Sequence, residues 1–178
     1  MVTAEKDARN FLYKIQAKKN ATEGAEMSVK NAFDRKNVLN LKILIGLDCS
    51  GSISAAQFTQ FMRQIDKIRG LSVVKVIEID DRIVAMYDYF RTSQGKVITI
   101  RGGGGTQFDE FFAAAEKMKP DAILFMTDGF VGDTVDNCSI PTGWILTDNG
   151  RRPYKFGEIL FKLPSLSTSG IDEDNDVE

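Results

Sequence analysis

A carboxylate and two hydroxyls occupy alternate positions in the stretch Asp48-Cys49-Ser50-Gly51-Ser52. The apolar run directly before this stretch, residues 41–47, is typical of a buried parallel strand. In an open α/β sheet, ligands bind at the carboxyl ends of such strands. Three hard oxygen donors on a tight turn suit Mg²⁺ or Mn²⁺, so the stretch predicts part of a site for one of these ions.

Two later segments supply further oxygen donors. A second apolar run, residues 122–126, ends in Thr127-Asp128-Gly129 and places another carboxylate at a strand end. Between the two runs lies a glycine-rich loop, residues 101–105, whose backbone can approach a ligand closely. Thr106 follows this loop. Together the three segments predict five metal ligands: Asp48, Ser50, Ser52, Thr106 and Asp128.

The types of these ligands indicate what the ion would do. The hydroxyls stay neutral when they bind a metal directly, while Asp48 and Asp128 can bind the ion or hold its waters. An ion with three neutral ligands remains electron-poor, and one of its positions stays open for an incoming carboxylate. No general base other than these two aspartates is evident, and both are committed to the ion. We therefore expect a binding site without catalytic residues.

Taken singly, the same residues have simpler explanations. The turn at Asp48 could hold only local backbone caps. Thr106 with Asp109 matches a capping box, and Asp128-Gly129 is a common turn dipeptide. The joint occurrence of all the parts favours the metal site over these separate explanations.

The composition excludes several other kinds of site and partner. The chain has 178 residues with no histidine and two cysteines, which removes Ser-His-Asp triads, Cys-His pairs and the usual zinc sites. Its net charge of −2 argues against general nucleic-acid binding. We expect a cytoplasmic protein without a membrane partner, because the sequence has neither a spanning apolar run nor an apolar signal core.

The segments around these loops predict an α/β fold. Residues 72–80 and 83–90 have the pattern of strands, and the turn at Asp80-Asp81 is too short for a crossover helix, so the two should be antiparallel. Apolar stripes predict helices that begin at Ser54, with a capping box, and at Thr106. The other predicted segments are an extended piece, a loop and two strands: residues 96–101, 130–141, 143–147 and 158–163.

The two ends of the chain differ from the central domain, which would span residues 41–164. Residues 1–40 predict a short helix followed by a polar linker, and residues 165–178 predict an acidic, disordered tail. Since the sheet would begin at Leu41, we expect that removal of residues 1–38 leaves a folded domain.

The metal motif resembles that of a known family. Asp-x-Ser-x-Ser, a later Thr after glycines and a later strand-end Asp match, in this order, the metal-ion-dependent adhesion site (MIDAS) of von Willebrand factor A (VWA) domains. A narrower resemblance, over residues 41–163, is to the bacterial VWA-like domain at the C-terminus of metallopeptidase-like proteins. It is carried by four segments: Gly103 to Phe108, Leu124 to Phe130, Trp144 to Thr147 and Phe156 to Ile159.

This resemblance implies both a fold and a function. The fold would be a doubly wound, mostly parallel six-stranded sheet in the order 3-2-1-4-5-6, with one antiparallel edge strand. The function would be that of a Mg²⁺-dependent protein-binding module, not an enzyme, in which the ion captures an Asp or Glu of a partner protein. A MoxR-type AAA+ ATPase is the partner that the resemblance implies.

Two alternatives stay open at this point. A haloacid-dehalogenase-like phosphohydrolase would use Asp48 as its nucleophile. That chemistry requires a second aspartate at position 50, where this chain has a serine, and a lysine suitably placed before Asp128, which this chain lacks. A degenerate module would keep the fold and lose the metal, which the five retained ligands disfavour.

Overall fold

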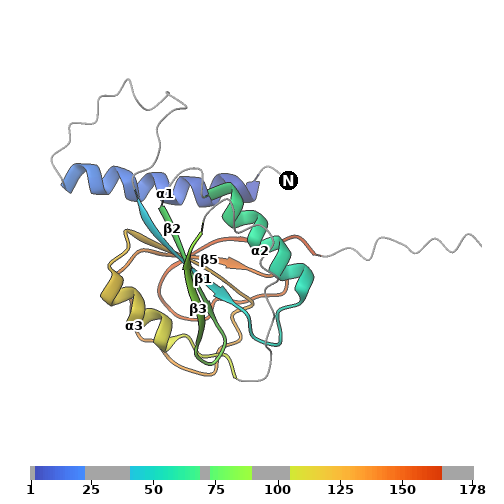
Figure 1. Ribbon diagram of the computed structural model, residues 1–178. Helices are drawn as coiled ribbons and strands as arrows, with labels where there is room; N and C mark the ends of the chain where they lie inside the picture. Colours follow the sequence, from blue (N-terminus) through green and yellow to red (C-terminus); the bar gives the residue numbers. More distant parts are fainter. Residues whose placement is uncertain (1–2, 23–40, 69–72, 90–104, 166–178) are drawn as a thin grey trace, which may run out of the picture.

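The computed structural model describes residues 3–22, 41–68, 73–89 and 105–165. Six strands lie in this part of the chain: Lys42–Asp48 (β1), Val73–Ile79 (β2), Ile83–Asp88 (β3), Ala122–Thr127 (β4), Thr142–Leu146 (β5) and Glu158–Lys162 (β6). They form one sheet in the order β3-β2-β1-β4-β5-β6 (Figure 1). β3 runs antiparallel to β2, and all other neighbouring strands are parallel. The predicted strand order and the antiparallel edge strand are confirmed.

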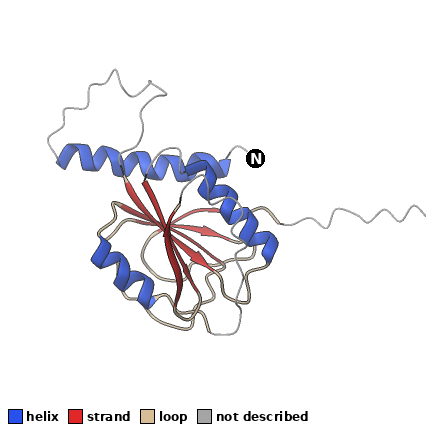
Figure 2. Ribbon diagram, in the orientation of Figure 1, coloured by secondary structure: helices blue, strands red, loops and turns tan. Residues whose placement is uncertain are grey.

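Helices cover both faces of this sheet, as the doubly wound fold requires. The described residues contain α1 (Thr3–Thr22), α2 (Ala55–Ile68) and α3 (Asp109–Met118). α1 and α2 pack on one face, and α3 packs on the other, so the strands lie between them (Figure 2). Each face therefore has its own hydrophobic core.

The core under α3 is largely aromatic, and Gly46 of β1 makes room for it. A Cβ at position 46 would lie 2.4 Å from the ring of Phe125, which stands on the neighbouring strand β4. Rings from α3, from the residue before it and from β5 surround Phe125, with centroid distances from 4.5 Å upward: Phe108, Phe111, Phe112 and Trp144. A side chain at position 46 would displace the ring at the centre of this cluster.

The start of α2 is as the sequence predicts. The backbone N–H of Ser54 donates to Gln57 Oε1 at 2.9 Å, and the backbone N–H of Gln57 donates to Ser54 Oγ at 3.2 Å. These reciprocal bonds are the capping box, and they satisfy two N–H groups that a helix start leaves without partners. Because the box is local, four residues were enough to predict it.

The sequence predicts a short helix outside the central domain, but α1 is long and its apolar face belongs to the core. It spans 20 residues, and its apolar stripe is buried with Leu160 and Phe161 of β6. Lys19, near its end, forms a 2.9 Å ion pair with Asp121, whose carboxylate also accepts the backbone N–H of Lys42 at 2.7 Å. The stripe consists of Ala8, Phe11, Leu12 and Ile15.

Several predicted segments lie outside the described residues. These are the polar stretch before Leu41, the extended piece at residues 96–101, most of the glycine-rich loop, and the tail from residue 166. The loop predicted at residues 130–141 is confirmed, since it contains no helix or strand. Among the helices that the structure describes, none has the length and apolar character needed to cross a membrane.

Candidate metal centre

The pairing of β1 with β4 brings the two predicted acidic ligands to one edge of the sheet. The strands are parallel, with Leu47 opposite Met126, so both strands end at the same edge of the sheet. Asp48 is fully buried there, and Asp128 is 5% exposed. The hydroxyl of Thr127 donates a 2.6 Å hydrogen bond to Asp48 Oδ2 and so joins the two strand ends.

The turn after Asp48 gathers the two predicted serine ligands. The backbone N–H of Ser50 donates to Asp48 Oδ1 at 2.9 Å, which folds the chain back over the carboxylate. The hydroxyl oxygens of Ser50 and Ser52 then lie 3.2 Å apart. Neighbouring ligands of an octahedral Mg²⁺, bound at about 2.1 Å, lie roughly 3 Å from each other. The spacing of the two hydroxyls therefore fits adjacent positions on one ion.

The electrostatics of Asp48 also suit a cation. Burial, together with a smaller contribution from the charge of Asp128, raises the pKa of its carboxyl group to about 6, against the hydrogen bonds from Ser50 and Thr127 that lower it. Two carboxylates thus share a place with little access to water. A divalent cation between them would offset the cost of burying their charge.

The donors at this site are mostly hydroxyls. Among the described residues, no group of three or more His, Cys, Asp or Glu side chains is placed to hold a metal. A site here must depend on serine and threonine oxygens, as the predicted ligand set does, and hard oxygen donors of this kind favour Mg²⁺ over zinc. Cys49 takes no part, because its side chain lies in the hydrophobic core.

The backbone around Thr106 is tied to the same edge of the sheet. Its carbonyl accepts the N–H of Gly132 at 2.8 Å, and the N–H of Gln107 donates to the carbonyl of Asp80 at 2.9 Å. Thr106 therefore lies between the loop after β4 and the turn after β2. Its side chain is half-buried there.

The prediction that a helix begins at Thr106 is wrong. α3 begins at Asp109, and no side chain at its own start forms the cap. Instead, Asp133 Oδ2 accepts the N–H groups of Phe108 at 2.9 Å and Asp109 at 3.0 Å. The carboxylate of Asp133 is held in turn by the hydroxyl of Tyr154 at 2.6 Å. Thr106 therefore does not cap α3, and its hydroxyl is available as a metal ligand.

Thr127 is the functional residue that the sequence pattern missed. Its hydroxyl donates to Asp48 Oδ2, as above, and also accepts the N–H of Gly129 at 2.8 Å, while the side chain is fully buried. It fixes the orientation of one predicted ligand and the start of the loop that carries another. A single hydroxyl that ends an apolar strand directly before Asp128 was the available signal.

The loop that carries Asp128 is clamped against the loop after β5. The backbone N–H of Arg151 donates to the carbonyl of Asp128 at 2.9 Å. Gly129 has φ +76°, and a Cβ there would lie 1.7 Å from the carbonyl oxygen of Arg151. Only glycine fits this left-handed, crowded position. Within Asp128 itself, Oδ1 accepts the N–H of Phe130 at 3.0 Å.

A family comparison covers the part of the chain that forms the sheet and the candidate site. A family model described as a VWA-like domain (DUF2201) matches residues 43–162. The matched region begins in β1 and ends with β6, so it includes the sheet and all five predicted ligands. No curated protein matches the chain.

Proposed function

Since the family model matches more than half of its residues, the chain belongs to the VWA-like domain family, and we propose that it is a Mg²⁺-dependent protein-binding module. Its metal-ion-dependent adhesion site would consist of Asp48, Ser50, Ser52, Thr106 and Asp128. When bound, Mg²⁺ or Mn²⁺ would supply an electrophilic position for a carboxylate. A partner protein with an exposed Asp or Glu would fill that position.

One observation carries this proposal. The buried Asp48 carboxylate lies beneath two hydroxyls 3.2 Å apart and beside a second buried carboxylate, at the sheet edge where α/β folds bind ligands. An isolated strand-end turn would not require two nearly inaccessible acids. Membership of a VWA-like family also makes the phosphohydrolase alternative less attractive, since position 50 is a serine.

The proposal describes a binding protein and not an enzyme. Both aspartates would hold the ion, and each oxygen of Asp48 also accepts one hydrogen bond. We therefore assign neither aspartate, and no other side chain of the described residues, as a general base. A MoxR-type AAA+ ATPase as partner rests on the sequence resemblance alone.

Divalent metal is expected to raise the melting temperature of the protein. A ligand at a hundred times its dissociation constant adds about 2.7 kcal/mol to the free energy of unfolding. For a chain of this size, that corresponds to roughly 5 to 10 °C. Thermal melts in Mg²⁺ or Mn²⁺ and in EDTA measure the difference, which Asp48→Ala should erase.

The control for this melt is Glu78→Gln. Glu78 is another buried acid, 7% exposed, and accepts a 2.7 Å hydrogen bond from Tyr87, but it is not a predicted ligand. Its substitution should leave the metal-induced shift unchanged. A shift of equal size in wild type and Asp48→Ala would exclude the predicted ligand set.

Partner binding tests the function directly. Immobilised protein is incubated with a lysate of its source in Mg²⁺ and in EDTA, and proteins retained only with metal are identified by mass spectrometry. In titrations of such a partner, Thr106→Ala should weaken binding with little change in stability, because Thr106 does not cap α3. Equal affinity in Mg²⁺, in EDTA and with Thr106→Ala would end the proposal and leave a metal-independent surface as the binding determinant.

A further inference from the structure

We propose that Arg151 and Phe130 form a second recognition point beside the metal centre, which binds an additional acidic residue of the same partner segment. The inference rests on the proposed function, since it assumes that one carboxylate of the partner binds the ion. It adds a requirement on the partner's sequence, namely two acidic residues close together.

The two side chains form a pair on the surface. The guanidinium carbon of Arg151 lies 4.4 Å from the centroid of the Phe130 ring. The described residues contain five exposed large apolar side chains, and Phe130, which is 47% exposed, is the one that adjoins a predicted metal ligand. Aromatic residues, Phe included, and arginine are both enriched at protein interfaces, and an arginine over a ring gains a cation–π attraction.

The backbone fixes this pair to the metal centre. Phe130 donates its N–H to Asp128 Oδ1, and Arg151 donates its N–H to the carbonyl of Asp128. Both recognition residues are therefore one hydrogen bond away from the same predicted ligand. The crowded glycine at position 129 keeps the two loops together. A segment whose carboxylate reaches the ion would pass next to this pair.

The charge of Arg151 identifies the chemistry of what it binds. No carboxylate in the described part of the chain lies within ion-pair distance of its guanidinium. A guanidinium that packs on a ring through its planar face keeps its in-plane N–H donors free for a ligand. Such a group is suited to a bidentate bond with a carboxylate, and the ring limits the rotamer freedom lost on binding.

Labelled synthetic peptides provide the test. One peptide carries a single aspartate in a Gly/Ser background, and three others carry a second aspartate one, two or three residues away. Dissociation constants are measured by fluorescence anisotropy in Mn²⁺ and in EDTA. In Mn²⁺, we expect the best two-aspartate peptide to bind wild type about tenfold more tightly than the single-aspartate peptide, as one exposed charge-assisted contact allows.

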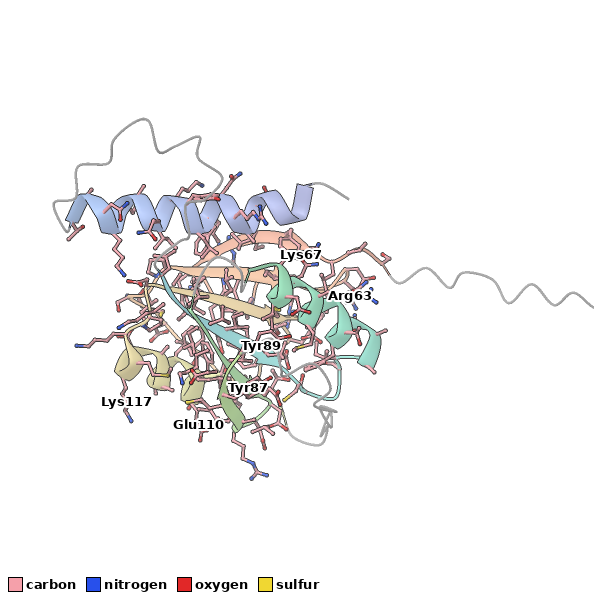
Figure 3. All side chains as sticks on the ribbon, turned by 45° about the horizontal axis from the view of Figure 1, so that its top comes forward. Arg63, Lys67, Tyr87, Tyr89, Glu110 and Lys117 are labelled. Atoms are coloured by element: carbon pink, nitrogen blue, oxygen red, sulfur yellow. The ribbon has the colours of Figure 1, made fainter. Side chains whose placement is uncertain are left out.

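Variants assign this gain to the pair. Arg151→Gln should remove the gain and leave single-aspartate binding intact, while Arg151→Lys, which keeps the charge without the planar donors, should retain part of it. Phe130→Leu should reduce the gain as well. The matched control is Arg63→Gln, which removes the same charge from an exposed position on α2 (Figure 3). Melts of all variants in EDTA should coincide with wild type.

The outcomes separate this inference from the proposed function. An undiminished gain in Arg151→Gln overturns the inference and leaves the metal-dependent module intact. A gain that persists in EDTA overturns the coupling to the ion. If no peptide binds more tightly in Mn²⁺ than in EDTA, the proposed function itself is contradicted, and the inference falls with it.

Discussion

Removal of α1 is expected to abolish the cooperative unfolding of the domain. The helix buries Phe11, Leu12 and Ile15 against the same core that α2 and β6 share, and Leu12 is completely inaccessible to solvent. Each large apolar side chain of this kind contributes about 1.5 to 3 kcal/mol when buried. Their sum is comparable to the whole stability of an ordinary domain, about 5 to 15 kcal/mol.

Two variants measure this effect by chemical denaturation. Deletion of residues 1–22 should give a protein without a sigmoidal transition, and Leu12→Ala should lower the free energy of unfolding by about 2 to 5 kcal/mol. The control is Tyr13→Ala, since Tyr13 is the next residue on the helix and is 45% exposed. If the deletion retained a full cooperative transition, α1 would be an accessory helix, as the sequence alone predicts.

A single sequence indicates which side chains of a helix are buried, but not what covers them. The apolar spacing of Ala8, Phe11, Leu12 and Ile15 indicates correctly that one face of a helix is buried. It does not indicate what covers that face, and a long polar stretch between two segments says nothing of their distance in space. The sequence therefore sets this helix apart from the core, whereas the structure buries its apolar face in that core.

The two helix starts also differ in whether their caps are formed by residues close together in the sequence. The cap of α2 is formed by Ser54 and Gln57, so the sequence predicts it correctly. The cap of α3 comes from Asp133, 25 residues after Phe108, and a local motif at Thr106 and Asp109 was mistaken for it. Nothing near Asp133 in the sequence marks it as a cap, because its partners become neighbours only when the chain folds.

The positions of the candidate metal ligands in the fold were predictable in part for a related reason. Four of the five candidate ligands follow directly from strand ends, and parallel strands bring their ends to one edge. The positioning residue Thr127 was not predicted, because nothing local distinguishes a hydroxyl that binds a neighbouring strand from one that binds its own backbone. Because Thr127 orients Asp48, a variant of Thr127 tests the site without removing a candidate ligand.

Thr127→Val is expected to weaken metal binding and to destabilise the fold. Valine keeps the shape of the side chain but loses the bonds to Asp48 and to the N–H of Gly129, both in a buried setting. A buried polar group without a partner costs about 1 to 3 kcal/mol. Loss of a residue that orients a metal ligand lowers metal affinity by about 10- to 100-fold. Calorimetric titration with Mn²⁺ measures the second effect.

Two further variants distinguish orientation of the ligands from stability. Thr127→Ser keeps the hydroxyl and should preserve most of the Mn²⁺ affinity. Thr142→Val removes another buried hydroxyl, which donates to the carbonyl of Ile140 at 3.0 Å. Thr142 is the first residue of β5, whereas Thr127 pairs with Leu146 at the other end of that strand. It should lower stability without changing Mn²⁺ affinity. If Thr142→Val and Thr127→Val lost affinity equally, the effect would come from general loosening of the sheet, and Thr127 would have no specific role in holding Asp48.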